Sequence, residues 1–239
     1  MRAAKPRGRV DVPVKPERVR RSDGEATQKK VYAVALRLFR RKGFAQTSMR
    51  DVAKAAQLSL GAAYHYYPSK DAILQAYFAE QIGHHERLFE ERAAGVVDLR
   101  ERLQLAFDAG LEVRREDRGL LGALAKVVLD RTSGASLFGE ASGEVRRRSI
   151  AIFARAVDVP VVSEDVRPLL ASSLWALHLG LLLYFVDDDS PDAAKTAKLT
   201  REVLDLVPPV ALFFGMPAME GMRDKLAAAL RDAGVPLTG

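Results

Sequence analysis

The sequence predicts an all-α protein with a small N-terminal three-helix head and a larger C-terminal helical bundle. Apolar residues recur at spacings of three and four along most of the chain, as on one face of an amphipathic helix. Clusters of glycine, proline, serine and aspartate divide the chain into helix-sized segments, and no alternating strand-like run persists. Basic residues gather in the first third, which distinguishes the head from the rest.

The composition excludes several classes of protein. The chain has 239 residues, of which 48% are hydrophobic, so it can form a packed core. It has no cysteine, which excludes disulfides, thiol nucleophiles and thiolate metal sites. The net charge is +6, but residues 1–22 carry +6, residues 23–80 carry +4 and residues 81–239 carry −4. This asymmetry indicates a polyanionic partner at the N-terminal end, either nucleic acid or an anionic membrane surface.

Residues 1–21 are expected to form a flexible basic arm, because they contain prolines and few bulky apolar groups. Order is expected from Ser22, which forms a capping-box pattern with Glu25. The helix that follows is predicted to extend to Lys42, where basic residues favour a helix C-terminus, and Gly43 is expected to end it.

A helix-turn-helix is predicted next. Cap residues and turn residues predict short helices at 48–56 and 59–67, and two short helices joined by three or four residues form this motif. A long helix over about 71–92 is expected to connect the helix-turn-helix domain, residues 22–70, to the helical body, residues 71–239.

The body is predicted to contain further helices near residues 98–115, 118–131, 143–157, 165–186, 191–206 and 218–233. Residues 169–186 are uncharged and just long enough to span a membrane. A helix that is apolar all round can equally be buried in a core and a subunit interface. The polar residues within the stretch and the lack of a second span favour the buried interpretation.

The sequence carries no catalytic signature. It lacks the nucleophile-elbow, phosphate-cradling and dinucleotide-binding glycine patterns. No two of its histidines form an i, i+4 pair, and the acidic run at residues 187–189 is interpreted as a solvated helix end. We therefore expect a protein that is not an enzyme and that uses no metal or cofactor.

The third predicted helix belongs both to the basic N-terminal third of the chain and to the helix-turn-helix motif. A recognition helix places its N-terminal residues on base edges, while flanking groups hold phosphates. Small residues would let this helix approach the bases, Leu60 or Ala62 could contact a thymine methyl, and Arg50 could pair bidentately with guanine. The candidate DNA-binding residues are Thr47, Ser48, Arg50, Ser59, Leu60, Gly61, Ala62, Tyr64, His65 and Lys70, whereas Tyr67 is expected in the core.

Four motifs keep a fixed spacing across residues 26–77: ALRLF at 35–39, KGF at 42–44, TSMRDVA at 47–53 and AYHYYPSK at 63–70. Together they resemble the N-terminal domain of the tetracycline-repressor (TetR) family. The resemblance implies a homodimer, a palindromic operator and a ligand pocket in the body that controls DNA binding. It also implies phosphate contacts from Thr47, Tyr64 and Lys70, and base reading by Arg50 and residues 59–62.

Two residues depart from the family pattern. Gln57 stands where the family usually has a left-handed glycine, which costs about 1–2 kcal/mol and can be borne by a packed domain. Leu60 stands where the family often has lysine or another polar residue. The departures leave an alternative open, a helical small-molecule-binding protein with weakened or non-specific DNA binding. A membrane-associated protein is the third and least favoured hypothesis.

The body is expected to be the sensor for a small, mainly apolar effector. The candidate ligand-binding residues are Phe107, Phe153, Trp175 and His178, and the wider apolar set adds Leu121, Phe138, Leu181 and Tyr184. The segments at 165–186 and 191–206 are the candidates for a dimer interface in the form of a four-helix bundle. We thus expect a cytoplasmic, homodimeric, ligand-responsive transcriptional regulator, a repressor in the first instance, that binds double-stranded DNA and no membrane.

Overall fold

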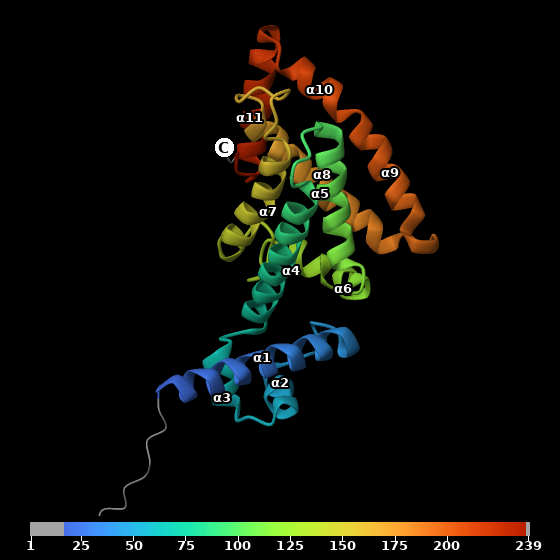
Figure 1. The fold of residues 1–239 in the computed structure, drawn as a ribbon. Helices are drawn as coiled ribbons and strands as arrows, with labels where there is room; N and C mark the ends of the chain where they lie inside the picture. The colour runs from blue at the N-terminus through green and yellow to red at the C-terminus, as the bar shows by residue number, and fades with distance from the viewer. Residues whose placement is uncertain (1–16, 238–239) are drawn as a thin grey trace, which may run out of the picture.

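The computed structural model describes residues 17–237, with side chains from residue 23 onward, so most of the predicted arm lies outside the described residues. Within that range the chain forms α-helices and short 3-10 turns and no β-strand, in agreement with the predicted all-α class. Figure 1 shows a head of three helices joined to a larger helical body.

The head consists of α1 (Glu17–Lys42), α2 (Met49–Ala56) and α3 (Leu60–Tyr66). The prediction that α1 starts with a capping box at Ser22 is wrong, because the helix begins at Glu17 and continues through this position. Residues 18–21 are mainly arginine, a good helix former, so the helix can begin before Ser22. Gly43 ends α1 with a φ of 87°, as predicted.

The helix-turn-helix forms through the predicted caps. The Ser48 hydroxyl accepts a hydrogen bond from the Asp51 N–H (3.1 Å), and the Asp51 carboxylate accepts one from the Ser48 N–H (2.9 Å). Hydrogen bonds from Ser48 lower the pKa of Asp51 to about 2. Gln57 follows α2 in the left-handed conformation, with a φ of 59°, and the Ser59 hydroxyl accepts from the Ala62 N–H (3.1 Å) to cap α3.

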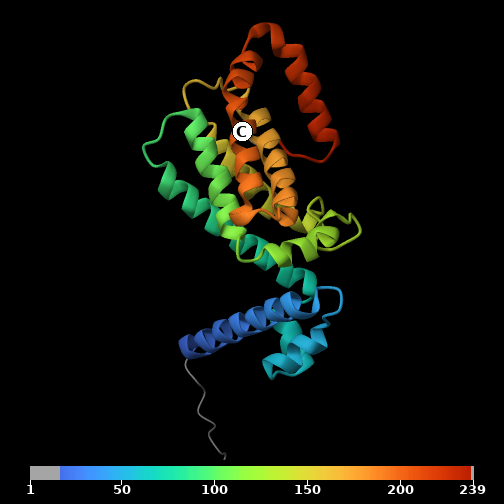
Figure 2. The same ribbon diagram turned by 90° about the vertical axis from the view of Figure 1, so that its right-hand side faces the viewer.

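The body is a bundle that α4 joins to the head (Figure 2). Its first part consists of α4 (Lys70–Ala93), α5 (Leu99–Arg114), α6 (Arg118–Leu129), α7 (Gly143–Ala156) and α8 (Arg167–Asp187). Its second part consists of α9 (Ala194–Asp205), α10 (Val207–Phe214) and α11 (Glu220–Asp232). Short 3-10 turns lie at Glu140–Ser142, Pro191–Ala193 and Pro217–Met219. The main core of the bundle includes the fully buried side chains of Phe89, Leu103, Phe107, Phe153 and Trp175.

A second core joins the head to the body. It contains the buried apolar faces of α1, α2 and α3, together with Ile73 and Tyr77 of α4 and with Leu120 and Leu124 of α6. The head therefore packs directly on α6, and α4 is not its sole connection to the body.

Helix α10 was not predicted from the sequence. It begins at Val207, followed by two prolines, and the predicted segment at 191–206 stops just before them. Proline is tolerated in the first turn of a helix, where its missing N–H would have no intrahelical partner. The two prolines therefore open a helix here instead of only ending the preceding one.

Helix α8 is long and apolar enough to cross a membrane, but half of its most apolar stretch is buried inside the protein. Trp175, near its centre, is 1% exposed. The exposed positions Ala176, Gly180, Leu183 and Tyr184 follow one side of the helix at spacings of three and four. This burial is typical of a core helix with one free face.

Candidate nucleic-acid interface and cavity

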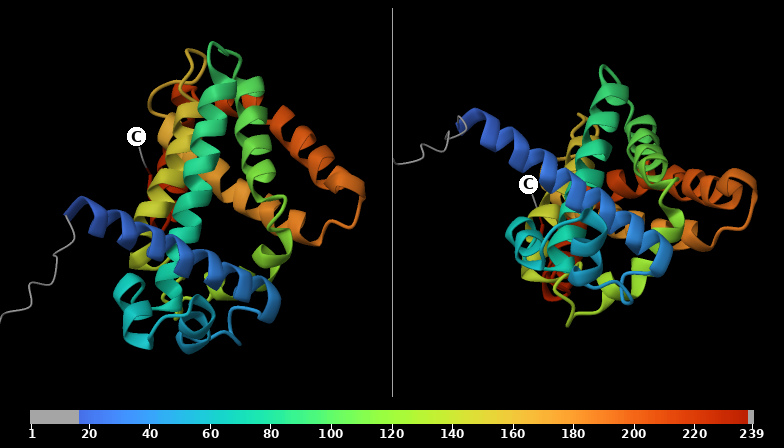
Figure 3. Two further views of the ribbon diagram at one scale, coloured as in Figure 1. Left: turned by 60° about the horizontal axis from the view of Figure 1, so that its bottom comes forward. Right: turned by 90° about the horizontal axis from the view of Figure 1, so that it is seen from below.

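Helices α2 and α3 lie at the outer end of the head, on the side away from the body (Figures 1 and 3). The N-terminal half of α3 is open to solvent, and a Cβ atom built on Gly61 would meet no atom within 4 Å. The predicted base-reading and flanking positions on this helix are all exposed or partly exposed: Ser59, Leu60, Gly61, Ala62, Tyr64 and His65. The structure thus brings them together on one accessible surface.

The two tyrosines that flank the end of α3 have different environments. Tyr64 is 46% exposed, so its hydroxyl is free to contact an external group. Tyr67 is partly buried and stacks on Tyr32 of α1, with ring centroids 6.5 Å apart. Tyr67 therefore packs within the head, as the sequence predicted.

The start of α2 contributes two exposed side chains, Ser48 and Arg50, to the same end of the head. Thr47 was expected to expose its side chain to a phosphate, but the residue is only 1% exposed. Its hydroxyl donates to the Gly43 carbonyl (2.8 Å). The predicted contact between the Thr47 side chain and a phosphate therefore does not fit the structure. A threonine before a helix can either contact a phosphate or form a hydrogen bond inside the domain, and its burial shows which of the two applies.

Lys70, at the start of α4, is held against the loop between α1 and α2. Its Nζ donates to the Phe44 carbonyl (2.7 Å) and lies 4.5 Å from the centroid of the Phe44 ring. Burial lowers its pKa. Since an ammonium group has three donors, Lys70 can keep this contact and still donate to a phosphate.

The body contains a cavity of about 390 Å³ that is partly open to solvent and within the usual size range of small-ligand sites. It lies between α4, α5, α6, α7 and α8 and is lined mainly by hydrophobic side chains, among them Phe78, Ile82, Leu121, Phe138, Leu179 and Leu183. A larger hollow of about 660 Å³ lies beside α5 and α9. Its lining is rich in charged side chains, of which Arg92 pairs with Glu112 (2.9 Å) and Arg100 with Asp205 (2.6 Å). The mainly apolar cavity is therefore the better candidate for an apolar effector.

Two of the four predicted ligand-binding residues, Trp175 and His178, line this cavity. The indole N–H of Trp175 donates to the Ser149 hydroxyl (3.1 Å). Phe107 and Phe153 are fully buried and pack against the His178 ring, with centroid distances of 5.3 and 5.4 Å. They therefore support the cavity wall from behind and do not face the cavity.

Sequence reasoning missed Arg114, the last residue of α5. It lines the cavity, it is 7% exposed, and its Nη1 donates to the Gly110 carbonyl (2.7 Å). Burial lowers its pKa to about 10, so the guanidinium is charged at neutral pH. No signal in the sequence distinguishes it, because a basic residue in the last turn of a helix is commonly a solvated partner of the helix dipole.

No group of three or more histidine, aspartate or glutamate side chains among residues 23–237 is placed to hold a metal ion. The adjacent histidines in the second half of α4 point to different environments, since His84 is exposed and His85 is buried.

Residues 31–77 match the family described as bacterial regulatory proteins, tetR family. These residues form a TetR-family helix-turn-helix domain. The match covers the helix-turn-helix whose open surface is described above, so this TetR-family protein is a DNA-binding transcriptional regulator. It is similar to the uncharacterised HTH-type transcriptional regulator YuxN of Bacillus subtilis, with 45% identity over 47 residues, 20% of this chain and 16% of that protein.

A second relative extends the likeness into the body. An uncharacterised HTH-type transcriptional regulator of Mycobacterium tuberculosis is 24% identical over 198 residues, which cover 82% of this chain and 94% of that protein. Among solved structures, a putative TetR-family regulator from Syntrophomonas wolfei has a TM-score of 0.61 and 18% identity, over 77% of this chain and 96% of the other. The fatty acid degradation regulator FadR from Bacillus halodurans has a TM-score of 0.60 and 16% identity, over 74% and 94%. These structures share the fold of the TetR-family protein.

In this TetR-family protein, α6 connects the head with the cavity. Its residues Leu120 and Leu124 belong to the core shared with the head, whereas Leu121 and Ala125 line the cavity. Different faces of α6 thus contact the head and line the cavity.

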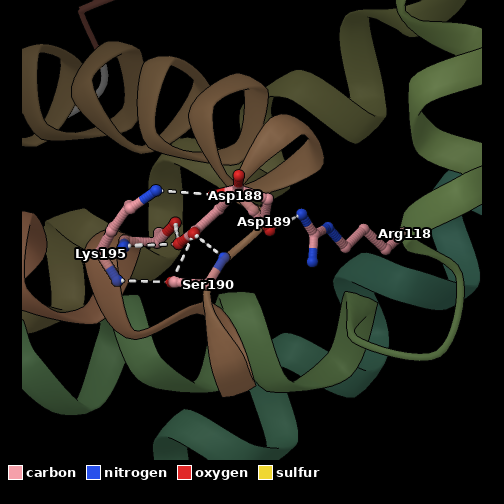
Figure 4. Close-up of polar contacts among 6 residues, drawn as sticks. Arg118, Asp188, Asp189, Ser190 and Lys195 are labelled. Carbon is pink, nitrogen blue, oxygen red and sulfur yellow. Dashed lines mark hydrogen bonds and ion pairs between the residues drawn. The ribbon is translucent and has the colours of Figure 1, made fainter.

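The start of α6 also contacts a polar network where α8 passes into α9 (Figure 4). Arg118, the first residue of α6, donates to the carbonyls of Val186 and Asp188. The Asp188 carboxylate accepts hydrogen bonds from Ser190 and from the N–H and hydroxyl of Thr196 (2.7 and 2.6 Å). Although burial would raise the pKa of Asp188, these hydrogen bonds hold it well below its usual range.

The interpretation of residues 187–189 as a solvated helix end is therefore wrong for the middle residue. Asp188 is 3% exposed and holds the first turn of α9 in place. Its neighbours Asp187 and Asp189 are exposed, as predicted.

Proposed function

We propose that this TetR-family protein is a ligand-responsive repressor that binds a palindromic operator as a homodimer in the bacterial cytoplasm. The observation that carries the proposal is the open surface of α3, formed by Ser59, Leu60, Gly61 and Ala62, on a chain whose body also contains an apolar cavity. A helix that reads base edges needs an accessible N-terminal half, and an effector needs a concave, mainly apolar site.

The proposed DNA contacts divide by chemistry. Residues 59–62 would lie against the base edges, and the forked guanidinium of Arg50 would pair with a guanine. Ser48, Tyr64, His65 and Lys70 would donate hydrogen bonds to phosphate oxygens and so fix the register of α3 in the groove. Thr47 would support this surface from inside the head.

The free side of α8 supports the proposed homodimer. Two small residues, Ala176 and Gly180, are followed along it by Leu183 and Tyr184, which are 44% and 43% exposed. Ala176, Gly180 and Leu183 also form the part of the cavity lining that is open to this side. Small residues allow close approach of a second helix, and large apolar ones gain stability when a partner covers them. We propose that α8 and α9 pack with their symmetry mates as a four-helix bundle and place the two α3 helices in successive major grooves.

The proposed response to ligand acts through α6. An effector in the cavity would contact Leu121 and Ala125, while Leu120 and Leu124 of the same helix pack on the head. In one arrangement of the dimer the two heads cannot span the operator. An effector that binds this arrangement more tightly would shift the population away from the DNA-bound state.

Selection of bound duplexes from random DNA tests the proposal. We expect an enriched inverted repeat with half-site centres about 34 Å apart, or a multiple of that distance. Enrichment of no sequence, together with steep salt dependence, would contradict the proposal. That result would favour the alternative, a ligand-binding protein with non-specific DNA binding, for which Leu60 in the recognition helix is the structural reason.

A further inference from the structure

We infer that the cavity recognises an amphipathic carboxylate, whose hydrocarbon body lies along the apolar lining and whose acid group binds between Arg114 and His178. This inference rests on the proposed ligand-binding role of the cavity and adds the chemical class of the ligand. It is carried by two polar side chains, both more than nine-tenths buried, in an otherwise apolar wall.

Arg114 is a buried positive charge that lacks an anionic partner. Its one hydrogen bond among the described residues goes to a neutral acceptor, the Gly110 carbonyl, and no carboxylate of residues 23–237 lies within ion-pair distance of it. Charged side chains are rarely buried unless they are paired, because desolvation of the charge is costly. An anion in the cavity would supply the missing pair, in the bidentate geometry that a guanidinium offers to a carboxylate.

His178 presents the second free polar group. It is 1% exposed, and neither of its ring nitrogens has a hydrogen-bond partner in the described part of the chain. Its ring is held by Phe107 and Phe153, which offer no hydrogen bond. A neutral imidazole carries one N–H donor, which a carboxylate oxygen can accept.

The two groups meet at Gly110 of α5. Its carbonyl accepts from Arg114, and a Cβ atom at this position would lie 2.7 Å from His178 Nε2 and 2.4 Å from His178 Cε1. The absence of a side chain at Gly110 therefore lets the His178 ring lie against the same turn of α5 that holds the guanidinium. This places a donor and a positive charge side by side on the cavity wall.

The other polar side chains of the lining each make at least one hydrogen bond within the protein, although Gln75 Oε1 and Arg146 Nε have no partner among the described residues. Arg146 donates to the Leu137 carbonyl (2.7 Å), and Gln75 donates to the Ser142 hydroxyl (2.7 Å). Ser149 accepts from Trp175. An uncharged ligand would leave Arg114 desolvated and unpaired, and a cationic ligand would be repelled by it.

The single tryptophan of the chain makes the inference testable, because Trp175 lines the cavity and reports ligand binding by its fluorescence. The probes are decanoate, 1-decanol and decylammonium, which share a hydrocarbon chain and differ in head group. We expect the full-length protein to bind decanoate at least tenfold more tightly than 1-decanol and to bind decylammonium least. Equal affinities for decanoate and 1-decanol would overturn the inference.

Three variants locate the acid group. Arg114→Met is expected to remove the preference for decanoate while 1-decanol still binds, and Arg146→Met, the matched control at the other arginine of the lining, is expected to keep it. Because Arg114→Met changes a buried residue, His178→Phe provides an independent test that keeps an aromatic ring. It is expected to weaken decanoate several-fold and leave 1-decanol unchanged. A preference that survives in both Arg114→Met and His178→Phe would overturn the assignment.

Release of operator DNA, measured separately by fluorescence anisotropy, distinguishes this inference from the proposed function. If decanoate binds through Arg114 but releases no operator, the ligand class stands and the ligand-responsive repressor is contradicted. If 1-decanol binds and releases the operator as well as decanoate does, the repressor stands and the anion site is contradicted.

Discussion

The Arg40 guanidinium of α1 donates two hydrogen bonds to the Asp117 carboxylate, at 2.7 and 3.0 Å, and so connects the head to the residue that precedes α6. Asp117 also accepts from the hydroxyl of Tyr77 on α4 (3.1 Å). One carboxylate thus ties together the head, the linking helix and the helix that lines the cavity.

The two partners of this contact should differ in their effect on stability. Asp117 is 12% exposed and Arg40 is 47% exposed at the side chain. Arg40→Ala is expected to cost less than about 1 kcal/mol, as for an exposed ion pair. Asp117→Ala is expected to cost about 2–3 kcal/mol, because it leaves the Tyr77 hydroxyl and the guanidinium without their acceptor. Urea unfolding of both variants measures the difference, and equal costs would contradict the central role of Asp117.

Replacing Gln57 by glycine is expected to stabilise the protein by about 0.5–1 kcal/mol. Gln57 has a φ of 59°, in the left-handed region where glycine avoids the steric cost of a Cβ atom. Ala55→Gly, at an exposed position of α2, is the matched control and should destabilise by about 0.5–1 kcal/mol. Thermal unfolding compares the two, and destabilisation by both glycines would show that the turn is not strained.

Stability is expected to fall as the pH is lowered from about 6.5 towards 5. Burial, with the Arg114 charge as a lesser cause, lowers the pKa of His85 to about 3, and burial together with His85 and Arg114 lowers that of His178 well below its usual range. In the unfolded chain both titrate near 6.5, so the unfolded state takes up protons that the folded state excludes. The loss should reach about 1.4 kcal/mol per pH unit for each histidine.

Urea unfolding at several pH values between 7.5 and 5 measures this slope. His178→Phe should make the slope shallower by the contribution of one histidine. His84→Gln changes an exposed histidine of the same helix as His85 and should leave the slope unchanged. A slope equal in the wild type and in His178→Phe would refute the burial of a neutral His178.

Two substitutions in the head should separate base reading from phosphate binding. Tyr64→Ala is expected to weaken all duplexes about equally, by roughly fivefold for the loss of one hydrogen bond. Arg50→Ala is expected to cost about 1–3 kcal/mol at one base pair and to relax the preference there. Binding of a panel of single-base operator variants measures both effects, and an unchanged preference after Arg50→Ala would exclude it as a base reader.

The head was predicted well from sequence because its signals are local. A cap such as Ser48 with Asp51 acts within one turn of helix, and the left-handed Gln57 is set by the short connection around it. The exception is the start of α1, because a helix can begin earlier than a good cap when the preceding residues also favour helix.

The cavity was predicted less well because its residues come together only in the tertiary structure. Trp175 and His178 were identified by their place on an apolar helix, but the same reasoning could not tell that Phe107 and Phe153 lie behind the wall. Arg114 was missed because the sequence does not show which basic residue at a helix end is buried by other helices.

The specificity of DNA binding at near-physiological salt tests the proposed function most directly. The affinity of the full-length protein is measured for the selected palindrome and for a scrambled duplex of the same length and composition. A sequence-reading dimer should prefer the palindrome by at least about a thousandfold. A ratio near one would contradict the proposal that the open surface of α3 reads an operator.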